Sequence, residues 1–295
     1  MKRNIATIGI IIILLIVSFT GCTQTVSEDT QYFIDNIPDM DENLRISLTN
    51  INTHLNNYDT EYKWSILMNY LTITSSMLSN MENYQESIND ELSYIDALIL
   101  DYNSAKEKAN LDQLDNEETT QMNNINDMIL DYNMNKDKVD YCLSNMSIYQ
   151  EYLTLVVQKL TLLEDYESHS LLLNNRVEDE EYEKAINTTD TIVDLFNQLK
   201  PIAFQMSNLS ILDYSEEILG IWDMYIESWQ LYKEHLELTI EGKYNQAEIK
   251  YNEYAEIFDD ILVIENTDNI NEGNNEIDYW YTTHIGSYLG LFEDI

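Results

Sequence analysis

Glycine and proline are scarce in this chain, which holds 7 glycines and 2 prolines among 295 residues. No glycine lies between Gly21 and Gly220, and no proline lies between Pro38 and Pro201. A β protein of this length needs glycine and proline at its turns, so their absence argues against strands. The sequence therefore predicts an all-α protein.

Basic residues are also few, with 15 Lys and Arg against 54 Asp and Glu, for a net charge of −39. A surface this negative repels nucleic acid, so a nucleic-acid partner is excluded. Two interpretations of the acidity remain open. One is a solvated surface suited to a salty or cation-rich exterior, which the even spread of acids along the chain favours. The other is a surface that attracts cations or basic partners.

The first residues have the pattern of an export signal. Lys2 and Arg3 precede an apolar run from Ile5 to Val17, which the segment SFTGC at 18–22 follows. That segment resembles the lipobox of prokaryotic lipoproteins, with Phe19 where an aliphatic residue is usual. The resemblance implies cleavage after residue 21, lipidation of Cys22, and an anchor on the extracytoplasmic face of the cell membrane. The alternative is an uncleaved transmembrane anchor, since a bilayer span needs about 17–25 residues.

The chain holds 2 cysteines, so lipidation of Cys22 would leave Cys142 without a disulfide partner. Cys142 lies on an apolar seam that runs from Ile125 to Leu163 in alternating steps of three and four. This spacing predicts a long helix with a coiled-coil-like face. We therefore interpret Cys142 as a core residue.

The remaining organisation follows from polar breaks. We expect a signal peptide over 1–21, a tether over 22–37, and a first helix starting at Pro38. Asn-rich breaks near Asn56, Asn80–Asn89 and Asp112–Asn116 would let long helices fold back antiparallel. The prediction is a helical bundle over 38–172, followed by a helical-hairpin region over 173–295 that ends in a docking helix.

Two internal repeats support this fold. Ile95–Lys108 recurs as Ile125–Lys138, which suggests a duplicated helical unit or simply shared packing. Glu180–Ala185 and Gly242–Ala247 each give a short turn followed by Tyr and Ala three residues apart. These two segments resemble the turn and second helix of a tetratricopeptide repeat, although Glu180 stands where that turn usually has glycine. The resemblance implies helical hairpins, in which the Tyr and Ala face the preceding helix.

Catalytic motifs are missing from the sequence. None of the 4 histidines lies in a His-Glu-x-x-His or Glu-x-x-His pattern, and neither a glycine-rich phosphate loop nor a nucleophile elbow is present. We therefore predict a protein that is not an enzyme and has no cofactor, no catalytic residue and no metal site.

Two segments of the sequence are candidate cation-binding sites. Asp39-x-Asp41-x-Asn43 has the first spacing of a calcium loop, but it lacks that loop's later glycine and glutamate. The segment from Asp268 to Asp278 is a polar loop rich in oxygen ligands around Gly273. A helix start at Asp39 and a solvated loop at Asp268 explain both segments more simply.

Other candidate sites are modification and ligand positions. Asn187 and Asn208 begin N-glycosylation patterns, and Asn145 begins a poorer one beside the seam residue Met146. Trp222 and Trp229 lie on an aromatic helical face that is a candidate ligand face, although such stripes are more often core.

These features predict a surface-tethered, non-enzymatic lipoprotein that acts as a scaffold or as a protein- or peptide-binding module. Its expected partners are the membrane, through the lipid anchor, and a protein of the cell envelope. The alternative is an extracytoplasmic protein that captures a small ligand or cations in a cleft between helices.

Overall fold

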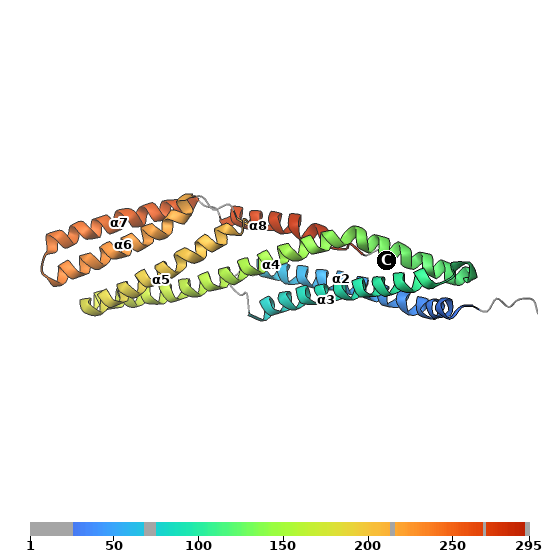
Figure 1. Cartoon of the computed structure of the whole chain (residues 1–295). Helices are drawn as coiled ribbons and strands as arrows, with labels where there is room; N and C mark the ends of the chain where they lie inside the picture. Colours follow the sequence, from blue (N-terminus) through green and yellow to red (C-terminus); the bar gives the residue numbers. More distant parts are fainter. Residues whose placement is uncertain (1–25, 68–74, 213–215, 268–269, 293–295) are drawn as a thin grey trace, which may run out of the picture. The chain divides into compact units, whose positions relative to one another are not determined.

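The structure is a computed structural model that describes residues 26–67, 75–212, 216–267 and 270–292. Within these ranges the chain is helical and contains no strand, so the all-α prediction is confirmed (Figure 1). The α-helices are α2 (Glu28–Leu67), α3 (Ser75–Lys108), α4 (Asn116–Glu178), α5 (Tyr182–Asn208), α6 (Glu216–Ile240), α7 (Tyr244–Thr267) and α8 (Ile270–His284). Two 3-10 helices are η1 (Leu111–Gln113) and η2 (Gly286–Tyr288). No helix in the described ranges combines the length and apolarity that crossing a membrane requires.

The described chain divides into two units, and the division falls inside α2, α3 and α4. Of the described residues, unit 1 contains those from 26 to 49 and from Asp90 to Met134, and unit 2 contains those from Asn50 to Asn89 and from 135 to 292. The polar stretch near Asn174, where the sequence suggested a boundary, lies inside α4.

Helix α2 begins earlier than the sequence pattern suggested. The prediction of a tether over 22–37 is wrong from Glu28 onward, because Phe33 and Ile37 are buried in unit 1. Burying side chains of this kind stabilises a fold by about 1.5–3 kcal/mol each. That gain offsets the cost of about 3 kcal/mol for Pro38, which lies inside the helix. The Ser27 hydroxyl caps the helix by accepting the N–H of Thr30 at 3.2 Å.

Two of the three predicted Asn-rich breaks are wrong. Asn56 lies inside α2 and Asn80–Asn89 lies inside α3. Within Asn80–Asn89, the buried side chains of Met81 and Ile88 hold the helix together where propensity alone is weak. The break near Asp112–Asn116 is present, and it separates α3 from α4.

The first sequence repeat forms an antiparallel pair in unit 1. The O–H of Tyr102 on α3 lies 3.3 Å from the carbonyl oxygen of Met122 and 3.1 Å from Oδ1 of Asn126, both on α4. It can donate to either oxygen. Tyr102 lies in the middle of the first copy and Asn126 near the start of the second, so the bond between them joins the two copies.

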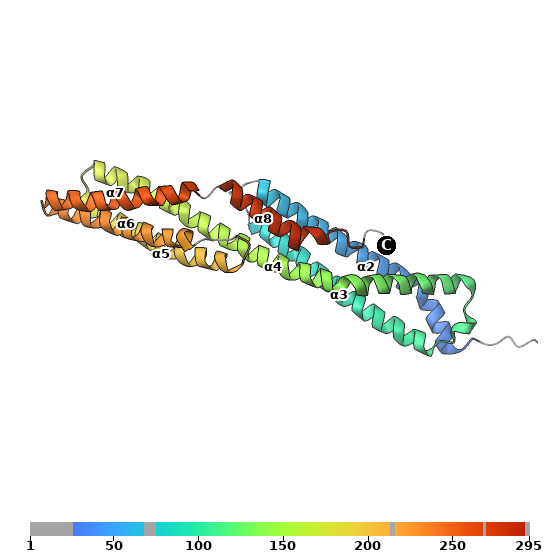
Figure 2. The same cartoon turned by 90° about the horizontal axis from the view of Figure 1, so that it is seen from above.

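The second copy makes the equivalent contact, from α4 to α3. The O–H of Tyr132 on α4 lies 3.2 Å from the carbonyl oxygen of Leu92 and 2.9 Å from Oδ1 of Asp96, both on α3. Tyr132, Leu92 and Asp96 stand at the positions of the repeat that Tyr102, Met122 and Asn126 occupy, with the two helices exchanged. The repeat is therefore a local pseudo-two-fold pair of helices, which lie side by side in Figures 1 and 2.

Unit 2 contains a core of large side chains from α4, α5, α6 and α7. Phe196 on α5 stacks on Tyr225 of α6, and Tyr166 of α4 packs edge-on against Phe196 and Trp229. The rings of Tyr254 and Phe258 of α7 also contact Trp229, with ring centres 5.7 and 6.4 Å from it. Figure 2 shows α5, α6 and α7 side by side.

The two turns of the second repeat have the same hydrogen bonding. The N–H of Glu181 donates to the carbonyl of Arg176 at 2.8 Å, and the N–H of Lys243 donates to that of Leu238 at 2.9 Å. The preceding residues, Glu180 and Gly242, have positive φ angles of 59° and 73°. Both turns are therefore Schellman motifs.

The side chains that follow these turns match the prediction only in part. Ala185 and Ala247 are buried, as expected from the Tyr–Ala spacing. Tyr182 packs against the unit 2 core, but Tyr244 is exposed. Nor does Pro201 interrupt the helix that follows the first of these turns. This residue lies inside α5, where the buried residues Leu199, Ala203 and Met206 continue the helix past it.

The last helix, α8, packs within unit 2 as expected for a docking helix. Tyr281 stacks on Tyr62 of α2, whose O–H donates to Oδ1 of Asp278 at 3.0 Å. Tyr141 of α4 bonds to Nδ1 of His284 at 2.5 Å. Ile277 adds a buried apolar contact to this face of α8.

Candidate functional site

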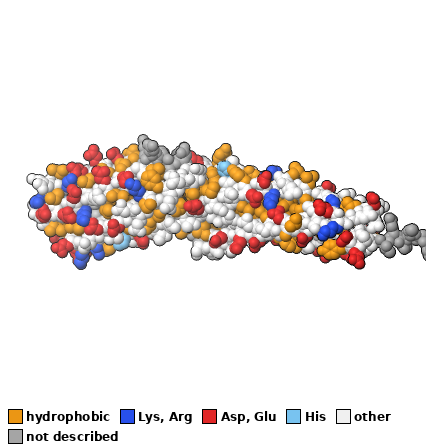
Figure 3. All heavy atoms as spheres, in the orientation of Figure 1, with side chains coloured by type: hydrophobic (Ala, Val, Ile, Leu, Met, Phe, Trp, Pro, Cys, Tyr) orange, Lys and Arg blue, Asp and Glu red, His pale blue; other side chains and the backbone are white. Residues whose placement is uncertain are grey.

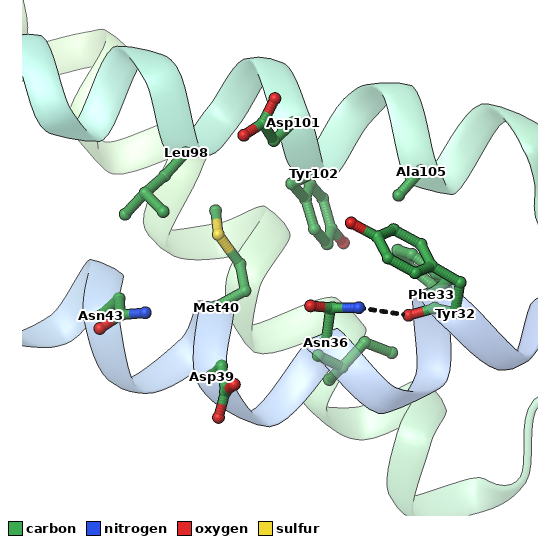
Figure 4. A pocket seen from close by; sticks show the side chains of 11 residues that line it. Tyr32, Phe33, Asn36, Asp39, Met40, Asn43, Leu98, Asp101, Tyr102 and Ala105 are labelled. Atoms are coloured by element: carbon green, nitrogen blue, oxygen red, sulfur yellow. Dashed lines mark hydrogen bonds between the residues drawn. The ribbon is translucent and has the colours of Figure 1, made fainter.

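A hollow of about 160 Å³ lies between α2 and α3 within unit 1 (Figure 4). Its floor is apolar and is formed by side chains that are almost completely buried. Phe33, Ile37 and Met40 come from α2, and Tyr102 comes from α3. Such a floor favours contact with an apolar group, because it offers little to a hydrogen-bonding ligand.

The margins of the hollow carry polar and acidic side chains, together with the apolar Leu98 and Ala105. On α2 the margin consists of Tyr32, Asn36, Asp39 and Asn43, and on α3 it consists of Leu98, Asp101 and Ala105. Figure 4 shows Asp39 and Asp101 on opposite sides of the hollow and Met40 extending into the space between the helices. None of the side chains that line the hollow is basic.

The position of the hollow follows from the contacts beside it. The Oγ1 of Thr30 accepts the N–H of Asn110 at 2.8 Å, and the rings of Phe33 and Tyr102 lie 5.6 Å apart. Tyr102 directs its O–H toward α4, so its ring forms the floor without filling the space. The small Ala105 leaves the remaining volume open. Burial raises the pKa of Tyr102 to about 12.

Asn36 and Tyr32 shape one end of the hollow. The side-chain amide of Asn36 donates to the carbonyl oxygen of Tyr32 at 2.7 Å, drawn as a dashed line in Figure 4. Tyr32 is 62% exposed although it borders a buried floor. An exposed aromatic ring beside an open apolar floor is a feature of protein-binding surfaces.

This site was not predicted from the sequence, because Tyr32 and Asn36 fall in the segment that was expected to be a tether. A signal was present in the same residues. Phe33, Ile37, Met40 and Leu44 follow the three-and-four spacing of an apolar helix face, and all four are buried. Counting that face across Pro38 would have found the helix and one wall of the hollow.

The calcium-like segment does not form a cation site. Asp39, Asp41 and Asn43 lie in α2, where residues two positions apart point in different directions. Asp41 instead pairs with Arg45 at 3.5 Å. Across the residues that the structure describes, no three His, Cys, Asp or Glu side chains are grouped so that they could hold a metal ion.

The second acidic segment is largely helical. The chain from Ile270 belongs to α8, so the prediction of a polar loop over 268–278 is wrong there. Asp278 accepts a hydrogen bond from Tyr62, which gives it a structural role. Asp268 lies outside the described residues.

The prediction of a ligand face at Trp222 and Trp229 is wrong. The two side chains are 8% and 4% exposed, and they belong to the unit 2 core. Neither indole N–H has a hydrogen-bond acceptor among the described residues. The ammonium of Lys159 lies 5.5 Å from the centre of the Trp222 ring, and burial lowers the pKa of this lysine. Aromatic packing therefore accounts for this face.

The glycosylation candidates differ in accessibility. Asn187 is exposed on α5, but Thr189, the third residue of its pattern, is buried and donates its hydroxyl to the carbonyl of Ala185. Asn208 is exposed at the end of α5, next to a turn in which Ser210 has a positive φ. Asn145 is buried. Asn208 is the position where both ends of the pattern are open to solvent.

The two cysteines are in different situations. Cys142 is buried, and burial raises the pKa of its thiol to about 12, which fits a core residue. Cys22 and the signal-like segment lie outside the described residues.

Figure 3 shows acidic side chains spread over the visible face with fewer basic ones between them. A comparison of the chain with known protein families, curated proteins and solved structures finds no match.

Proposed function

We propose that this chain is a non-enzymatic binding module, anchored through Cys22 on the outer face of the cell membrane. It holds a segment of another cell-envelope protein at the hollow between α2 and α3. The observation that carries the proposal is an open apolar floor with acidic margins in the three-helix unit 1. An apolar side chain of a partner would enter the hollow, and its basic neighbours would meet the margins.

The size of the hollow supports a protein partner over a small molecule. Pockets for small ligands usually measure about 300–1,000 Å³, and this hollow measures about 160 Å³. That volume suits a single side chain presented by a larger surface. The lack of a grouped set of metal-binding side chains among the described residues gives the cation-capture alternative no specific support.

Site-directed photo-crosslinking in membranes of the native host tests the binding role. A photoreactive amino acid at Asn36, on the margin of the hollow, should give a covalent adduct with one protein, and mass spectrometry would identify the crosslinked peptide. Glu107 is exposed on α3 and does not line the hollow, so it is the control position. Equal adducts at both positions, or none at Asn36, would contradict the proposal.

The anchor has a separate test. Intact mass spectrometry of the protein from its own membranes should give the mass of residues 22–295 plus lipid. A mass that begins at Met1 would instead support a transmembrane anchor, and the binding role would remain to be judged by the crosslinking result.

A further inference from the structure

The margins of the hollow belong to two longer helical stripes within unit 1. On α2, Tyr32, Asn36, Asp39 and Asn43 are spaced three or four residues apart, and the same spacing reaches the exposed Ile46. One face of a helix repeats at this interval, so the five side chains form a continuous line. The line covers about four turns, or roughly 21 Å.

A second stripe runs along α3. Ala105, Asp101 and Leu98 line the hollow, and the exposed Tyr94 continues their spacing. Contacts of Thr30 with Asn110 and of Phe33 with Tyr102 show that α2 and α3 are antiparallel here. Ile46 and Tyr94 therefore lie toward the same end of the pair. Both stripes have an aspartate in the middle and an exposed apolar side chain near an end.

Two antiparallel stripes of this kind form the surface that receives another helix. Side chains of the incoming helix enter the spaces between residues spaced three and four apart. Unit 1 supplies three helices, α2, α3 and α4, and a helix lying between α2 and α3 would complete a four-helix arrangement. The hollow would then take one apolar side chain near the centre of the contact.

We propose that the partner segment is an amphipathic α-helix of about four turns with Lys or Arg on both sides of its apolar stripe. This inference rests on the proposed function, since it specifies what the α2–α3 hollow binds. Cations are needed on both sides because Asp39 and Asp101 lie at opposite margins. Charge also argues against a second copy of this chain, which carries a net charge of −39 and would place like charges together.

Three synthetic helical peptides of about four turns test the inference by calorimetry against the full chain. The first has a leucine stripe flanked by lysines, the second replaces the lysines with glutamates, and the third scrambles the first. The lysine helix should bind, and the glutamate helix should not. The scrambled peptide should bind at least about tenfold more weakly, because it has the charge without the stripe. Equal binding of the scrambled peptide would overturn the inference.

Variants of the chain locate the contact. Asp39→Asn combined with Asp101→Asn should weaken binding of the lysine helix by about threefold to tenfold and reduce its salt dependence. Glu107→Gln combined with Asp127→Asn removes the same charge from exposed positions outside the hollow, and should change the affinity less than about twofold. An equal effect of the two pairs would overturn the proposed site.

Ala105→Met provides a second variant that keeps the charge. The longer side chain should fill the hollow and lower the affinity for the lysine helix by at least about tenfold, with the helical content unchanged by circular dichroism. Unchanged affinity in this variant would contradict the central role of the hollow. If the lysine helix fails to bind while Asn36 still gives a specific crosslink, the cationic helix is wrong and the binding role stands.

Discussion

The two sequence repeats produce two different kinds of structure. In unit 1 the copies face one another, and Tyr102 and Tyr132 each reach across to the opposite helix. In unit 2 the copies form successive turns of similar geometry, at Glu180 and Gly242. The first repeat therefore specifies an interface between helices, and the second specifies how one helix ends and the next begins.

The difference shows what a repeated segment encodes. Tyrosines of the first repeat are buried and bonded across the pair, so their positions fix the register of α3 against α4. Tyrosines of the second repeat are only partly buried, at Tyr182, or exposed, at Tyr244, and the shared feature there is the backbone. Sequence similarity within a chain can thus record either side-chain contacts or backbone conformation.

The largest expected effect comes from the core of the pseudo-two-fold pair. Ile95 and Ile125 occupy equivalent positions and are fully buried. Replacing either with alanine should lower the free energy of unfolding by about 2–5 kcal/mol, with similar values at the two positions. Urea denaturation measures both.

The same repeat supplies the controls for this experiment. Leu100 and Leu130 are also equivalent, but they are 70% and 60% exposed. Their alanine variants should change the free energy of unfolding by about 0.5 kcal/mol or less. A cost at Ile95 below half of that at Ile125 would show that the pair is symmetric in geometry but not in energy.

Removing the hydroxyl of Tyr132 should lower the free energy of unfolding more than removing that of Tyr102. Tyr132→Phe removes a hydrogen bond to the carboxylate of Asp96 and should cost about 1.5–3 kcal/mol, because the acceptor is charged. Tyr102→Phe removes a bond to the neutral amide of Asn126 and should cost about 0.5–1.5 kcal/mol. Denaturation of both variants, with and without Asp96→Asn, provides the comparison. If the difference survives that substitution, the charge of the acceptor is not its cause.

Substitutions in the two turns should change the free energy of unfolding in opposite directions. Glu180 has a positive φ, a conformation that is unfavourable for a residue with a side chain, so Glu180→Gly should stabilise the chain by about 1 kcal/mol. Gly242→Ala should destabilise it by about as much. Added at Gly242, a Cβ meets no atom within 4 Å, so backbone conformation alone would cause the loss. Thermal unfolding measures both, with Glu180→Asn expected between Glu and Gly.

A further effect is expected at alkaline pH. Burial raises the pKa of Tyr102 from about 10 to about 12, so the folded state favours the protonated phenol. This contribution to stability is complete below about pH 10 and is lost as pH rises through about 12. In urea denaturation at pH values between about 10 and 12, Tyr102→Phe should make the decline of the free energy of unfolding with pH shallower.

Much of the fold could be predicted from the sequence, because the apolar seams and the missing turn residues both depend on local composition. The errors share one physical cause. At Pro38, Asn56 and Asn80–Asn89, residues that weaken a helix suggested a helix boundary, and buried neighbours carried the helix through. Tertiary burial outweighs local propensity at each place.

The hollow was harder to predict from the sequence. Its two walls come from α2 and α3, and the stripes at Tyr32–Asn43 and Leu98–Ala105 each resemble an ordinary helix surface. Only the register of the two helices brings Asp39 and Asp101 to opposite margins of one apolar floor. The sequence spacing at Trp222 and Trp229, by contrast, is compatible with a core as well as with a ligand face, and burial distinguishes them.

The placement of the indole side chains gives the chain an intrinsic optical reporter. Trp222, Trp229 and Trp280 are buried, whereas Trp64 is half exposed. Emission from Trp222 and Trp229, whose N–H groups have no acceptor among the described residues, should lie at short wavelength. Emission from Trp64 should lie at longer wavelength and be quenched by iodide. One fluorescence spectrum would therefore distinguish loosening of the unit 2 core from a change at the surface of α2.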